Sequence, residues 1–222
     1  MKGKMIVKII VDIFMTVALL LLMAYSMIGE KAHEWIGAIM FLLFVVHHIL
    51  NSFWSRNILK GKYNIRRIVQ SLIVVLIFFC MAGSMISGII ISRYVFSFLN
   101  ITSGASWARS VHMLCAYWGF VLMSIHLGFH WNMVIAMMGK ITKGRKAWKI
   151  AARTMAFVVA IYGIIAFIKR DIGNYMTLNN QFVFFDFTEP VIYFILDYLA
   201  VMGLFVAIGH YLAKIMVKKA WI

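Results

Sequence analysis

The sequence predicts an all-α membrane protein with about six transmembrane helices, in a single domain over residues 1–222. Three observations predict this fold class. Hydrophobic residues make up 64% of the chain, whereas soluble domains are roughly half apolar. Only seven of the 222 residues are acidic, and only one is proline. Finally, the apolar residues gather in six long runs separated by short polar gaps, the pattern of a chain whose solvent is lipid.

Each of the six runs approaches or exceeds the length of an α-helix that crosses a bilayer. At 1.5 Å per residue, about 20 residues span a hydrocarbon core of about 30 Å. The predicted spans are Ile9–Ile28, His33–Phe53, Ile68–Ile91, Trp107–Met138, Ala151–Ile168 and Val191–Val217. The fourth is longer than a membrane requires, so it is expected to tilt or to project beyond the bilayer.

The net charge of +15 predicts membrane topology rather than nucleic-acid binding. Every second gap is strongly basic, at Lys2–Lys8, Arg56–Arg67, Lys140–Arg153 and Lys214–Lys219. Basic loops mark the cytoplasmic side and attract anionic lipid. The alternation therefore places both termini in the cytoplasm, predicts a bacterial-type cytoplasmic membrane with lipid as partner, and excludes nucleic acid as a partner.

Four histidines occur at matched positions in two of the spans. His33 and His47 are fourteen residues apart in the second span, and His112 and His126 are fourteen apart in the fourth. Fourteen steps of about 100° come within about 40° of four full turns, so each pair shares one helix face. Both spans cross the membrane in the same direction. His33 is therefore level with His112 near the outer side, and His47 is level with His126 near the inner side.

Two imidazoles facing each other are able to supply both axial ligands of a haem iron. Polar side chains inside a membrane are costly, which favours a functional role for four of them over ordinary packing. Zinc would require four clustered ligands, whereas these pairs lie roughly 21 Å apart along the helix. No Cys-x-x-Cys-His motif for covalent haem attachment occurs. The sequence thus predicts two haem b groups per chain in a haem-binding four-helix bundle core.

Further residues are candidates for cofactor contact. Gly37 and Gly119 would allow a flat macrocycle to approach the backbone, although small residues also serve ordinary helix packing. Arg93 and Arg109 would pair with the propionates of the outer haem, although arginine is common at membrane interfaces. His130, one turn beyond His126, would bond a propionate or a quinol, or would be an interfacial side chain.

An internal likeness selects His47 over its neighbour His48 as the ligand. Aligning the stretch from His47 with the stretch from His126 keeps both fourteen-residue spacings equal, and His48 then points about 100° away. Asp197 is the one acid well inside a span beyond the first. It is expected to be a proton relay, the partner of a buried cation, or a hydrated interfacial residue.

These features resemble known families. The paired spacing resembles the four-helix di-haem cytochromes b of respiratory complexes. A closer resemblance is to a domain-of-unknown-function family of small membrane cytochromes that accompanies flavinylated electron-transfer proteins. It rests on residues 33–37, 47–54, 108–118, 126–131, 184–187 and 197–200. One departure is in residues 51–54: the family pattern has a tryptophan directly after the asparagine, whereas here two residues separate them. The resemblance implies haem b and electron exchange between the cytoplasmic side or a quinone pool and an extracytoplasmic flavoprotein or other redox protein.

The leading functional expectation is therefore an electron-transfer subunit of an oxidoreductase system rather than a complete enzyme. The chain has no G-x-G-x-x-G nucleotide-binding motif and no nucleophile constellation. Two alternatives remain. The first is a transporter or proton channel that uses the intramembrane histidines and Asp197. Transporters usually contain broken helices, whereas the only proline of this sequence, Pro190, lies at a predicted helix start. The second is a haem-free membrane assembly factor.

Overall fold

The computed structural model describes residues 2–61, 63–141 and 145–218, and all regular structure within them is helical. Six long helices form the molecule: α1 (Lys2–Met23), α3 (Glu30–Leu50), α5 (Ile65–Ile91), α6 (Ala105–Ile141), α7 (Lys146–Lys169) and α9 (Val191–Lys218). Short helices lie in the connections: α2 (Tyr25–Ile28), α4 (Ser52–Arg56), the 3-10 helix η1 (Ser97–Leu99) and α8 (Ile172–Met176). All six long helices are long and apolar enough to cross a membrane, which confirms the predicted fold class of a helical integral membrane protein.

Two predicted spans end earlier than hydropathy alone indicates. The first span does not run unbroken to Ile28, because the chain leaves α1 after Met23 and forms the separate turn α2. Gly29 follows α2 with a φ of +88°, a conformation that glycine adopts at little cost, and it turns the chain into α3. The second span ends at Leu50 rather than Phe53, where the side chain of Asn51 bonds back to the carbonyl of His47.

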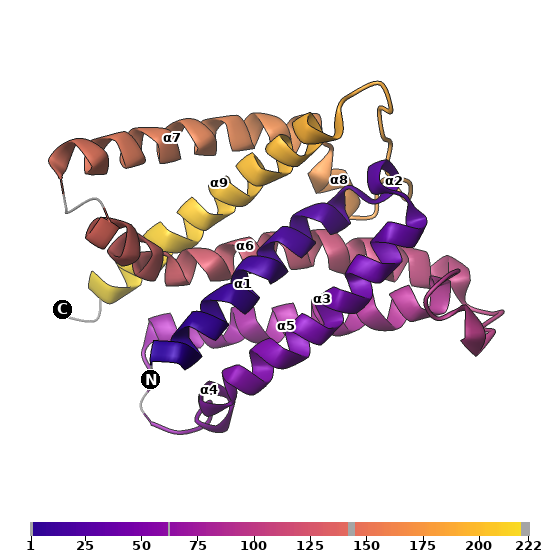
Figure 1. The fold of residues 1–222 in the computed structure, drawn as a ribbon, viewed down its shortest axis with the longest axis horizontal. Helices are drawn as coiled ribbons and strands as arrows, with labels where there is room; N and C mark the ends of the chain where they lie inside the picture. Colours follow the sequence, from indigo (N-terminus) through magenta and orange to yellow (C-terminus); the bar gives the residue numbers. More distant parts are fainter. Residues whose placement is uncertain (1, 62, 142–144, 219–222) are drawn as a thin grey trace.

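Helix α6 is the central element of the fold. Its 37 residues extend over about 55 Å, longer than the hydrocarbon core, as its sequence indicates. It packs against α5 and α9, and α9 in turn packs against α7 (Figure 1). The closest approach of α6 and α9 is at Gly128 and Gly209, where a Cβ atom on either glycine would collide with the backbone of the other helix. Small residues allow this kind of close contact between membrane helices.

Helices α1 and α3 form an antiparallel pair that lies beside this group (Figure 1). The pair touches the rest of the molecule mainly where α1 meets α9 and α3 meets α5. The backbones of α3 and α6, in contrast, make little or no close contact, so these two helices meet through side chains.

The six long helices alternate in direction, so α3 and α6 run the same way. The start of α1 and the end of α9 lie at one end of the bundle (Figure 1). We call it the basic end, because its helix ends and connections carry Lys4, Lys8, Arg56, Lys60, Arg66, Arg67, Lys140, Arg145, Lys146, Lys149 and Lys214. We call the opposite end, which carries α2, η1 and α8, the far end.

Candidate functional site

The structure brings His33 of α3 and His112 of α6 together near the far end. Their ring centroids lie 6.0 Å apart and their planes are inclined by 66°. Two imidazoles that share a metal ion, each at an imidazole–metal distance of about 2 Å, have ring centroids roughly 6 Å apart. The spacing of this pair is therefore that of two axial ligands on one iron.

The ring of His112 is anchored through one nitrogen. Its Nδ1 donates to the carbonyl oxygen of Ser84 at 2.9 Å and lies 3.2 Å from Oγ of Ser87. A carbonyl oxygen only accepts, so the proton resides on Nδ1 and the lone pair is on Nε2, the atom that is then free to ligate. Gly88 on α5 leaves room for this ring, since a Cβ atom there would lie 3.4 Å from Cε1 of His112.

The ring of His33 is less constrained. It packs edge-on against Tyr25, with the ring centroids 5.0 Å apart, while the hydroxyl of Tyr25 donates to Glu30 at 2.8 Å. Burial and this hydrogen bond raise the pKa of Tyr25 to about 12, so its hydroxyl keeps its proton. Nδ1 of His33 is buried without a well-formed hydrogen bond, although the backbone of Leu22 on α1 lies near the ring. Such burial is costly for a polar group.

The second predicted pair, His47 and His126, lies toward the basic end. The two side chains are close enough to interact electrostatically, but their rings are not in contact among the described residues. Nδ1 of His47 donates to Oδ1 of Asp12 on α1 at 2.7 Å. The ring of His126 packs on that of His130 with centroids 4.9 Å apart, and its Nδ1 is buried without a partner.

Each pair therefore combines one anchored imidazole with one imidazole whose Nδ1 is buried and unpaired. The anchored members are His112 and His47, and the unpaired members are His33 and His126. The ring spacing of His33 and His112 fits one bis-imidazole haem site, and His47 with His126 would provide the donors of a second. No group of three or more His, Cys, Asp or Glu able to hold a metal ion occurs in the described residues, so the arrangement consists of pairs and does not form a zinc-type cluster.

The structure places His48 differently from His47. Its Nδ1 donates to the carbonyl of Phe44 at 3.0 Å, one turn earlier in the same helix. Its ring packs on Phe44 and faces Phe78 of α5, with centroid distances of 4.2 and 6.3 Å. His48 thus contacts a neighbouring helix and is directed away from Asp12.

The remaining candidate residues have the following surroundings. Nε2 of His130 accepts from the amide of Gln70 at 3.2 Å, next to Arg66, whose buried Nε has no partner. A Cβ atom on Gly37 would lie 4.0 Å from Leu22 of α1, and one on Gly119 would lie 3.5 Å from Cys80 of α5. Arg93 is exposed and pairs with Glu30 at 3.4 Å, and Arg109 is exposed one turn before His112.

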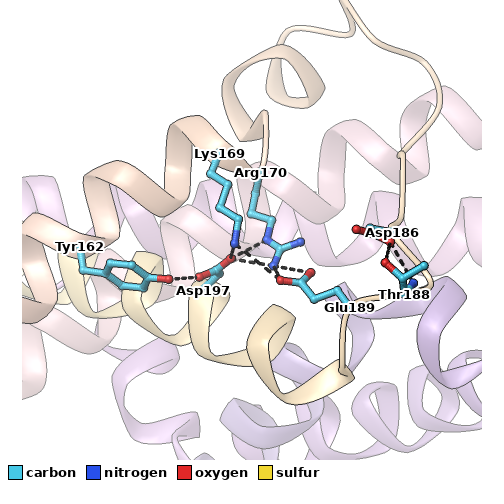
Figure 2. A network of polar contacts seen from close by, with 7 residues as sticks. All are labelled: Tyr162, Lys169, Arg170, Asp186, Thr188, Glu189 and Asp197. Atoms are coloured by element: carbon cyan, nitrogen blue, oxygen red, sulfur yellow. Dashed lines mark hydrogen bonds and ion pairs between the residues drawn. The ribbon is translucent and has the colours of Figure 1, made fainter.

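Asp197 lies in an ion-pair network on the other side of the bundle, between α7 and α9 (Figure 2). Its side chain is only 2% exposed and accepts hydrogen bonds from Tyr162, from Lys169 at 2.9 Å and from Arg170 at 2.8 Å. Arg170 also binds Glu189 at 2.7 Å. Of the three roles expected from the sequence, Asp197 fills that of a partner for cations.

Two contacts of the histidines toward the basic end were not predicted from the sequence. Asp12 bonds His47, and Gln70 bonds His130. An acid inside the first predicted span, one turn after Lys8, is a signal that Asp12 has a polar partner. The sequence does not show that α1 lies beside α3, so it does not identify His47 as that partner.

The fold and these histidine pairs define a polytopic helical membrane protein with paired intramembrane imidazoles. No protein-family model matches the chain, and neither the curated proteins nor the solved structures include a match. The likeness to small membrane cytochromes stays a prediction that rests on the residue stretches named above.

Proposed function

We propose that this protein is a di-haem b-type cytochrome that carries electrons across a membrane. His33 and His112 hold one haem near the far end, and His47 and His126 hold the other toward the basic end. When bound, the haems supply one-electron redox chemistry at iron, and the chain fixes the ligands, excludes water and tunes the potential.

The observation that carries this proposal is the contact between His33 and His112. Two helices whose backbones stay apart present imidazoles to each other at the centroid spacing of a shared metal ion, 6.0 Å. The fourteen-residue spacing then places a second histidine of each helix, His47 and His126, roughly 21 Å further along the same two axes, where we propose the second site.

The charge distribution supports an orientation of the protein in the membrane. We place the basic end in the cytoplasm of a bacterial-type cell, because basic helix ends mark the cytoplasmic side. With haem bound, His47 and His126 would hold the group on the side of a cytoplasmic or quinone-pool donor, and His33 and His112 would hold the group on the side of an extracytoplasmic acceptor. The resemblance stated above indicates that the acceptor bears a flavin.

The proton-channel alternative is weakened by the network around Asp197. A relay carboxylate must exchange protons, whereas this one is held by three donors, two of them cationic.

The pigment of the purified protein tests the proposal. We expect a b-type pyridine haemochrome at about two haems per chain, because two histidine pairs are available. A ratio near one would mean that only one pair ligates. A protein that stays colourless after expression with sufficient haem and reconstitution with haemin would contradict the proposal and favour a transporter or an assembly factor.

A further inference from the structure

We propose that Asp12 is the positioning residue of the haem at the basic end: its carboxylate fixes His47 and lowers the reduction potential of that haem. This inference rests on the proposed function, since it requires His47 to be an axial ligand. It assigns a role to an α1 residue that the histidine pattern does not include.

The contact itself determines which nitrogen of His47 is available. Nδ1 lies 2.7 Å from Oδ1 of Asp12, the length of a charge-assisted hydrogen bond. A carboxylate accepts, so Nδ1 keeps its proton and Nε2 carries the lone pair. The amide of Asn51 lies 3.5 Å from Nε2, a weak contact that agrees with Nε2 as an acceptor and leaves it available to a metal.

Helix α1 is held against α3 by a second bond beside this one. Lys8, one turn before Asp12, donates to the side chain of Asn51, one turn after His47, at 3.0 Å. Two successive turns of α1 therefore bind two successive turns of α3. This arrangement fixes the rotation of α3 and thus the direction in which His47 presents its Nε2.

The two haem sites differ in the chemistry of the anchor. At the far end, Nδ1 of His112 donates to the neutral carbonyl of Ser84. The carboxylate of Glu34, next to His33, is bonded instead to Ser92 and to the backbone of residues 93–95. A carboxylate behind a ligating imidazole raises the basicity of the ligand more than a carbonyl does, and it stabilises ferric iron.

Other charges at the basic end lie near the proposed haem site but are not bonded to the ligand His47. Lys8 is bonded to Asn51, and the guanidinium of Arg66 lies beside His130 and the carbonyl of Phe129. These cations would raise the potential, whereas Asp12 lowers it through the ligand itself. Asp12 therefore favours electron transfer from the basic-end haem to the far-end haem.

The test uses the full-length holoprotein in three forms: wild type, Asp12→Asn and Asp12→Glu. Asparagine keeps an acceptor near Nδ1 but removes the charge, and glutamate restores the charge. Optical redox titration should show two midpoint potentials. In Asp12→Asn we expect one of them to rise by about 59 mV, which is a tenfold change in the equilibrium constant of a one-electron couple. The low-spin electron paramagnetic resonance signal of that haem should also change.

Two further variants identify the haem and control for location. In His47→Ala only the far-end haem should remain, so its potential shows which of the two values Asp12→Asn has moved. Ser87→Ala removes a neutral contact to His112 and should leave the basic-end potential unchanged.

The outcomes separate the inference from the proposed function. If the wild type holds no haem, the proposed function fails. If the wild type holds two haems and Asp12→Asn shifts neither potential, the positioning role of Asp12 is wrong. If Asp12→Asn loses a haem that Asp12→Glu keeps, the carboxylate is what positions His47. If both variants lose it, Asp12 only maintains packing and the inference is overturned.

Discussion

At the scale of single residues, the four histidines are not equivalent. His112 and His47 have their orientation set by hydrogen bonds at Nδ1, whereas His33 and His126 bury the same atom without a partner. An unsatisfied buried polar atom costs about 1–3 kcal/mol. The rings of His33 and His126 are thus the costlier members of the two pairs to bury.

Single substitutions should divide the histidines into two groups. His33→Ala and His112→Ala should remove the same haem and leave the same spectrum, because their rings are in contact. His47→Ala and His126→Ala should remove the other haem. His48→Ala should retain both, since its ring packs on phenylalanine. Difference spectra of the five purified variants give the comparison. Loss of a haem in His48→Ala but not in His47→Ala would shift the ligand in α3 by one residue.

Asp197→Asn should destabilise the protein without changing its haem spectrum. The substitution removes the charge that pairs with Lys169 and Arg170, and breaking a buried ion pair costs about 3–5 kcal/mol. We expect less than this range, because the Lys169 side chain is 51% exposed and solvent can rehydrate it. Thermal unfolding in detergent measures the loss. Asp186→Asn is the control, since the side chain of that exposed acid bonds the nearby Thr188 among the residues that the structure describes.

At the scale of helices, the sequence predicts the spans well and their neighbours poorly. Hydropathy places all six spans, because each must match the thickness of a bilayer. The contact of His33 with His112 is also predictable, since helix period and alternating direction fix its face and level. The bonds of Asp12 and Gln70 are not predictable in this way. They depend on which helices lie side by side, and apolar patterning in lipid does not encode that order.

The contact of α6 with α9 should be sensitive to a single methyl group. In Gly128→Ala the new Cβ would collide with the backbone of α9 near Val206, so the helices must separate, at a cost of about 1–3 kcal/mol. Because His126 is two residues away, haem occupancy at the basic end should also fall. Gly139→Ala in the same helix meets nothing within 4 Å and should be neutral or slightly stabilising. Equal thermal stability of the two variants would argue against the close α6–α9 contact.

At the scale of the whole molecule, the two ends differ in charge. The basic end carries the Lys and Arg residues named above, whereas Glu30, Glu34, Asp171 and Glu189 lie toward the far end. This asymmetry is the basis on which we propose a side of the membrane for each histidine pair.

Reporter fusions test the orientation. A reporter active only in the cytoplasm should be active when fused to either terminus, and one active only outside should be active when inserted in the far-end segment before α9. An independent measurement is the labelling of cysteines introduced at Lys60 and Asn180 by a thiol reagent that does not cross the membrane. These residues lie at opposite ends of the bundle, so only one of them should be protected from the reagent. An externally active reporter at the C-terminus would reverse the assignment of the two haems.

The network around Asp197 also has a consequence for how the chain enters the bilayer during synthesis. Inserting an unpaired aspartate costs about 2.5–3.5 kcal/mol at a helix centre and less at Asp197, which lies near the start of α9. Its partners Lys169 and Arg170 end the preceding helix and are synthesised first. In the orientation that we propose, both cations are on the outer side before α9 is synthesised. We therefore expect α7 and α9 to enter lipid as one hairpin whose ion pairs neutralise the carboxylate. Membrane integration of α9 should then depend on α7, which truncated chains would reveal during translation.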